Sequence, residues 1–168
     1  MVNVFIENTG DDTYALWGAN ANPQDILFKD CVAINPGIMR PKWYGNCVAT
    51  YGLKSVVFEN ITCKASSPED PIPQPGSGEI MIDTSMFVFY TSFGGSYPSD
   101  NAVCIRGASF MNLSGQKYTP LEGSLKVYEP HKMVWTPTED GVLAPFYLPS
   151  KTQQVNVKAC LSGSTDCC

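Results

Sequence analysis

The sequence predicts an all-β fold: a right-handed parallel β-helix, truncated to a few coils and closed by an irregular C-terminal cap. Three observations favour this class. No segment keeps a 3.6-residue apolar period, short β-rich runs alternate with Gly, Pro, Asn and Asp, and the runs repeat with like residues at like positions. An antiparallel sandwich is the alternative, and it explains the short runs but not the repeat.

The repeat also predicts how the 168 residues are organised. Residues 1–115 are expected to form the coils. Within them, residues 66–78 are expected to be a surface loop, because that stretch is rich in proline and glycine and has no apolar face. Residues 116–168, where the pattern fades, are expected to form a β-rich cap with a disulfide-prone tail. Such a cap would cover strand edges that are otherwise open to pairing.

Four segments carry the first repeat: "NVFIEN" from Asn3, "DILFKD" from Asp25, "SVVFEN" from Ser55 and "GASFMN" from Gly107. Stacked about 4.8 Å apart, they predict columns of like residues. The columns are an apolar one (Val4, Ile26, Val56, Ala108), a mostly aromatic one (Ile6, Phe28, Phe58, Phe110), a turn column (Asn8, Asp30, Asn60, Asn112) and an outward charged one (Glu7, Lys29, Glu59).

A second series starts with Asn or Asp and ends in Gly six residues later: "DTYALWG", "NCVATYG" and "NAVCIRG". The alternation of a strand places Trp17, Tyr51 and Arg106 on one outer face, and Asp11 has the same parity as Trp17. The preceding segment "MRPKWYGN" brings further aromatic residues to the same end. Carboxylates beside flat apolar rings are typical of a carbohydrate cleft.

The stretch "NTGDDTYALW", followed by "DILFKDCVAINPG" and "NCVATYGLKSVVFENITC", resembles β-helical glycoside hydrolases with the pectin-lyase-like fold. The resemblance is best over residues 3–65, and the nearest types are mutanase-type α-1,3-glucanases and mycodextranases. It implies a secreted, inverting endo-hydrolase of α-glucan, of which this chain is a fragment or short form.

On that resemblance, Asp11 and Asp12 are the catalytic acid and base candidates. The residues expected to bind the polysaccharide are Trp17, Trp43, Tyr44, Tyr51 and Arg106. Members of the family use a further Asp from the preceding coil, which has no counterpart in this sequence. An inverting site needs carboxyl groups about 6.5–9.5 Å apart, whereas adjacent strand residues point to opposite faces.

Simpler interpretations stand beside these. Asp11 and Asp12 can form a plain turn, in which Asp12 takes the first position of the second series, as Asn46 and Asn101 do. Trp17 and Tyr51 can be ordinary surface aromatics or contacts to another chain. The corresponding alternative function is a non-catalytic structural or carbohydrate-binding subunit of an extracellular assembly, with another subunit stacked on the N-terminal strands, whose open edge is a template for pairing.

Composition narrows the partners. The net charge of −5 argues against nucleic acid, and no apolar run is long enough to span a bilayer. Seven cysteines without a CxxC pair and a single histidine argue against zinc, so neither a metal nor an organic cofactor is expected. Disulfides favour an extracellular location, and sequons at Asn60 and Asn112 permit glycosylation. The start of the chain lacks a signal-peptide pattern, which favours a mature form or a fragment.

Overall fold

The structure is a computed structural model that describes residues 1–18, 21–39, 45–65, 86–90, 95–111, 113, 115, 132–137, 143–146 and 155–160. Within these residues the chain forms ten strands and no helix, so no helix is long and apolar enough to cross a membrane. Sheet A contains, in order, β1 (Phe5–Glu7), β3 (Ile26–Ile34), β5 (Ser55–Lys64), β7 (Ala102–Met111) and β10 (Val157–Cys160). Sheet B contains β2 (Tyr14–Trp17), β4 (Val48–Tyr51), β6 (Phe87–Tyr90), β8 (Lys132–Pro137) and β9 (Leu143–Phe146).

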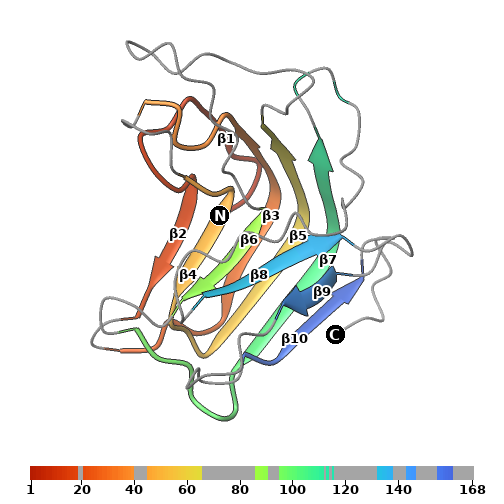
Figure 1. The fold of residues 1–168 in the computed structure, drawn as a ribbon. Helices are drawn as coiled ribbons and strands as arrows, with labels where there is room; N and C mark the ends of the chain where they lie inside the picture. Colours follow the sequence, from red (N-terminus) through yellow and green to blue (C-terminus); the bar gives the residue numbers. More distant parts are fainter. Residues whose placement is uncertain are drawn as a thin grey trace.

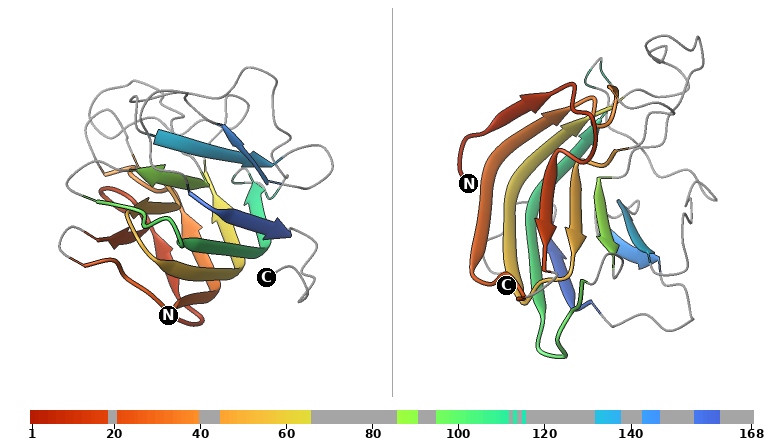
Figure 2. Two further views of the ribbon diagram at one scale, coloured as in Figure 1. Left: turned by 90° about the horizontal axis from the view of Figure 1, so that it is seen from below. Right: turned by 90° about the vertical axis from the view of Figure 1, so that its left-hand side faces the viewer.

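The prediction of a parallel β-helix with a separate cap is wrong. The strands form two sheets that face each other (Figures 1 and 2), and sheet B turns antiparallel where β6 meets β8 and again where β8 meets β9. Strands β8, β9 and β10 come from the predicted cap, yet they extend the two sheets. The alternative antiparallel sandwich is wrong as well, because every pairing in sheet A is parallel. The predicted loop at 66–78 lies outside the described residues.

The long strands of sheet A are built from five-residue halves joined at left-handed residues. In β5 the buried side chains are Val56 and Phe58 before Asn60, and Ile61 and Cys63 after it. Asn60 has φ 54°, and it shifts the in–out alternation by one residue, as a local bend in a strand does. Asn, Asp and Gly tolerate this conformation better than other residues, which is why they occupy the joints.

The predicted columns hold where two long strands meet. Ile26 pairs with Val56, Phe28 with Phe58, and Lys29 with Glu59, as predicted. The prediction misplaced the segment around β1 by five residues. Ile6 was expected beside Phe28, whereas it pairs with Ala33.

The predicted columns therefore fail at their first and last members. In the apolar column Val56 meets Val103, whereas Ala108 meets Ile61. Phe110 meets Cys63 in place of Phe58. In the turn column Asp30 and Asn60 do meet, but the partner of Asn8 is Asn35. Glu7 faces Ile34, so it lies outside the charged column.

Aromatic rings fill the space between the sheets. Phe28 and Phe58 stack with ring centroids 5.3 Å apart, and Phe87 of sheet B meets Phe58 edge-on at 5.3 Å. The Tyr14 ring contacts Phe28 edge-on, and the Tyr14 hydroxyl donates a hydrogen bond to the Val32 carbonyl at 2.7 Å. These rings are almost fully buried, so the core depends on both sheets.

A disulfide ties the two sheets together. Cys47, directly before β4, bonds to Cys63 in β5, with Cα atoms 6.0 Å apart. Cys104 is also disulfide-bonded, whereas Cys31 is a free, buried thiol. The expectation of disulfides is therefore confirmed.

Candidate functional site

The acid pair lies in the turn between β1 and β2. The Asp12 backbone N–H donates to Asp11 Oδ1 at 3.0 Å, and the Thr9 hydroxyl donates to the Asp11 carbonyl at 2.5 Å. Thr9 also accepts a hydrogen bond from the Gly37 N–H at 3.0 Å, which fixes the turn against the chain after β3. Asp11 is exposed and closes the turn with its own side chain, a common use of Asp.

The Asp12 side chain accepts three hydrogen bonds. Its Oδ1 accepts from the backbone N–H and the side-chain amide of Asn46, both at 2.8 Å. Its Oδ2 accepts from the Tyr51 hydroxyl at 2.6 Å. Three donors thus converge on one carboxylate, and each bond to an ionised acceptor is stronger than a neutral one.

Burial raises the pKa of the Asp12 carboxyl above its ordinary value of 3.8. The hydrogen bonds from Tyr51 and Asn46 oppose this rise, and the nearby charge of Asp11 adds to it. Burial is the largest of these influences, so the site favours the neutral carboxyl group relative to water. A carboxyl group with a raised pKa fits a proton donor, but it also fits a structural acid at a sheet edge.

Trp17 and Tyr51 are register partners on the outer face of sheet B, as the sequence predicted. Trp17 is 62% exposed, whereas Tyr51 is half-buried and packs against a small cluster of Ala49 and Val88. Because Asp12 holds its hydroxyl and this cluster supports its ring, Tyr51 is fixed at both ends. The outer face is therefore open at β2 and covered over β4 and β6.

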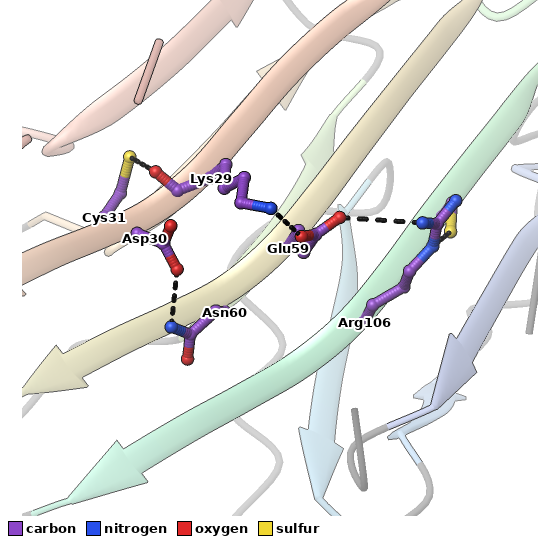
Figure 3. A network of polar contacts seen from close by, with 7 residues as sticks. Lys29, Asp30, Cys31, Glu59, Asn60 and Arg106 are labelled. Carbon is purple, nitrogen blue, oxygen red and sulfur yellow. Dashed lines mark hydrogen bonds and ion pairs between the residues drawn. The ribbon is translucent and has the colours of Figure 1, made fainter. Parts of the chain in front are cut away.

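Arg106 lies elsewhere, and its predicted place beside Trp17 and Tyr51 is wrong. Its strand, β7, belongs to sheet A, where Arg106 faces Glu59 at 3.5 Å (Figure 3). The second series misplaced it because "NAVCIRG" copies the spacing of a sheet B strand, although β6 takes that position beside β4. Trp43, Tyr44 and the sequon residue Asn112 lie outside the described residues.

Asn46 is the site residue that sequence reasoning missed. It is buried and supplies two of the three hydrogen bonds to Asp12. The signal was present, because Asp12 and Asn46 occupy the same position in the second series. Asn46 is followed by Cys47, so the Cys47–Cys63 disulfide holds the main chain that presents these donors.

The acid pair already has hydrogen-bond donors within the protein. Both Asp12 oxygens are occupied by donors from the protein, and Asp11 is the next residue, with its Cα only about 3.8 Å away. Among the residues that the structure describes, no three His, Cys, Asp or Glu side chains gather closely enough to hold a metal ion.

No protein-family model, no curated protein and no solved structure matches the chain.

Proposed function

We propose that the chain is a secreted, non-catalytic carbohydrate-binding component of an extracellular assembly. The observation that carries the proposal is the exposed Trp17 ring beside Tyr51, with the Tyr51 hydroxyl fixed by Asp12. Sugar rings stack on flat apolar surfaces of this kind, and a ring that is already ordered loses little freedom on binding.

Two features support an extracellular location. The Cys47–Cys63 bridge persists best in an oxidising compartment. Asn60, in the sequon Asn60-Ile61-Thr62, is exposed. If the protein is secreted by a glycosylating cell, treatment with an endoglycosidase should lower its mass, and Asn60→Gln should remove part of that change. A chain of unmodified mass with free thiols would contradict secretion.

The assembly part of the proposal rests on the N-terminal edges. β1 ends sheet A and β2 ends sheet B, so both sheets present an edge strand on the N-terminal side. Large apolar side chains are exposed there, including Phe5 on β1 and Trp17 on β2. Exposed edges with apolar side chains are suited to pairing with another chain. The proposed partner is a second protein subunit that stacks on these strands.

Hydrolysis of an α-glucan, which the resemblance implies, is the second candidate. One observation favours it: burial raises the pKa of Asp12, as a general acid requires. Asp11 would then have to serve as base. The engagement of both Asp12 oxygens by Asn46 and Tyr51 is the argument against this candidate.

Carbohydrate binding is tested by co-sedimentation with insoluble α-1,3-glucan and by titration with soluble α-1,6-glucan and polygalacturonate. Trp17→Ala should weaken binding at least tenfold, because aromatic anchors carry much of the binding energy at such surfaces. Phe5→Ala is the matched control, since Phe5 is 59% exposed but lies on sheet A. Equal binding by the two variants, or no binding by the wild type, would refute the proposed site.

A further inference from the structure

The left-handed joints of sheet A form two lines that run across the strands. Asn3, Asp30, Asn60 and Gly107 share one line, with φ between 52° and 63°. Asn8 and Asn35 share the second line, at 55° and 49°. Within a strand the joints are five residues apart. In β3 both five-residue halves are bounded by such residues, at Asp25, Asp30 and Asn35.

Side chains link neighbouring joints along these lines. The Asn60 amide donates to Asp30 Oδ1 at 2.7 Å (Figure 3), and the Asn35 amide donates to Asn8 Oδ1 at 3.1 Å. Both lines end on the outermost strand, at the exposed Asn3 and Asn8. Among the described residues, neither the Asn3 side chain nor the Asn8 amide nitrogen has a hydrogen-bond partner. The lines are therefore open to one more strand.

Charges on the outer face of sheet A also alternate from strand to strand. Lys29 on β3 meets Glu59 on β5 at 2.5 Å, and Glu59 meets Arg106 on β7 at 3.5 Å (Figure 3). On β1 the exposed residue Glu7 faces Ile34, which has no charge. A strand added beyond β1 would therefore be favoured if it placed a cation opposite Glu7.

The core beneath β1 is incomplete in the same direction. Val4 and Ile6 pack against the core cluster but are only partly buried. Two apolar side chains from an added strand, in line with Val4 and Ile6, would cover them.

We propose that the β1 edge binds, in parallel, a partner strand with Asn or Asp five residues apart and Lys or Arg opposite Glu7. This inference rests on the assembly part of the proposed function, and it specifies the partner. Such binding is strand addition, in which the main chain supplies affinity and the side chains supply specificity. Residues 25–30, "DILFKD", show that the pattern forms a strand, because Asp25 and Asp30 are both left-handed and Lys29 precedes the second joint.

The probe is a fluorescein-labelled synthetic peptide with the sequence of residues 24–30, QDILFKD. In the parallel register its two Asp residues meet Asn3 and Asn8, and its Lys meets Glu7. The control peptide, QDILFED, carries Glu in place of Lys. Fluorescence anisotropy measures both peptides against the wild type and Glu7→Lys, whose exposed position makes the folded state tolerant of the change.

The wild type should bind QDILFKD about fivefold more tightly than QDILFED, and Glu7→Lys should reverse this order. Asp100→Asn, which removes an exposed carboxylate outside β1, should leave both affinities unchanged. Equal binding of both peptides by both proteins would overturn the requirement for a cation opposite Glu7. It would still support strand addition, so the assembly role would survive. No binding of either peptide would overturn the inference. Sedimentation tests the assembly role independently of the peptides. A chain that sediments as a monomer at all concentrations and binds no other subunit would contradict that role.

Discussion

Sheet A and sheet B are built from the same chain in alternation, yet only sheet A keeps one direction throughout. All four pairings of sheet A are parallel, from β1 to β10. Sheet B begins in parallel over β2, β4 and β6 and then changes direction at β8 and β9. The two sheets also differ in the residues at which their strands bend or end. Sheet A repeats left-handed Asn, Asp or Gly residues in line, whereas the first strands of sheet B each end at a glycine.

Those glycines in sheet B serve close packing. A Cβ added at Gly18 would lie 2.8 Å from the Gly52 carbonyl oxygen, and one at Gly52 would lie 2.3 Å from the Ser96 backbone nitrogen. Side chains at the joints therefore pair across sheet A, while bare backbone packs against backbone in sheet B. Paired side chains at the joints therefore support the register of sheet A, whereas sheet B depends on the shared core and the Cys47–Cys63 disulfide.

The largest expected effect tests the core that both sheets share. Phe58→Ala should lower the free energy of unfolding by about 3–5 kcal/mol, because the Phe58 ring is fully buried between Phe28 and Phe87. Urea unfolding measures the change. Phe5→Ala, at the exposed edge, should change stability by no more than about 0.5 kcal/mol. Similar losses in the two variants would mean that the sheets do not share this core.

The next effect concerns the bond between the sheets. Replacing both Cys47 and Cys63 by Ala should lower the free energy of unfolding by about 3 kcal/mol, because the bridge closes a loop with a sequence separation of 16. Reduction of the wild type should cost at least as much, because it also breaks the disulfide of Cys104. Cys31→Ala controls for the loss of a small buried side chain, since Cys31 is free. A double variant as stable as wild type would show that sheet B holds its place without the bridge.

A smaller effect is expected at the turn that leads into sheet B. Asp12→Ala should lower the free energy of unfolding by about 1–3 kcal/mol, because the buried donors of Asn46 lose their acceptor. Asp12→Asn keeps the shape and an acceptor oxygen, so its loss should stay below about 1 kcal/mol. Chemical denaturation at pH 7 compares the two. Equal losses would show that the charge of Asp12, and not its role as acceptor, stabilises the turn.

The pH dependence of this site follows from the raised pKa of Asp12. Between 3.8 and the raised value, the native state holds a proton that the unfolded state has released. The stability from Asp12 is therefore fully present below pH 3.8 and falls as the pH rises through the folded-state pKa. Asp12→Asn should remove this fall. Denaturation midpoints from pH 3 to pH 7 measure it, and an opposite slope in the wild type would contradict the direction.

The smallest effect tests the joints of sheet A. Asn60→Ala should cost about 1–2 kcal/mol, because alanine resists the left-handed conformation that Asn60 adopts at φ 54°. Asn60→Gly should be close to neutral, since glycine accepts that conformation and Gly107 occupies the same line on β7. Both variants lack the side-chain amide that donates to Asp30, so the difference between their free energies of unfolding isolates the effect of the backbone conformation. An Ala variant as stable as the Gly variant would show that the joint is not what fixes the register.

The register errors have a physical cause in these joints. The segment at Asn3–Asn8 matches residues 25–30 and residues 30–35 equally well, because both stretches are bounded by Asn or Asp. The sequence alone therefore leaves β1 ambiguous by five residues, and long-range contacts choose Ala33 as the partner of Ile6. Where the nine residues of β3 meet the ten of β5, as at Phe28 and Phe58, the longer match removes the ambiguity.

The candidate site divides in the same way. The pairing of Trp17 with Tyr51 could be predicted, because it follows from local alternation and one repeat. The sequence assigned Asp11 to the aromatic face by parity, but the turn breaks that parity and brings Asp12 to the Tyr51 hydroxyl. Arg106 was misplaced because the choice of sheet for its strand depends on β6, which has a different pattern.

The most direct test of the central claim measures binding and cleavage in one sample. Wild type, Trp17→Ala and Asp11→Asn/Asp12→Asn are incubated with α-1,3-glucan and α-1,6-glucan, and bound protein and released reducing ends are both measured. We expect the wild type to bind glucan without releasing reducing ends and Trp17→Ala to lose the binding. Reducing ends released by the wild type and lost in the double Asp variant would contradict it and establish a hydrolase.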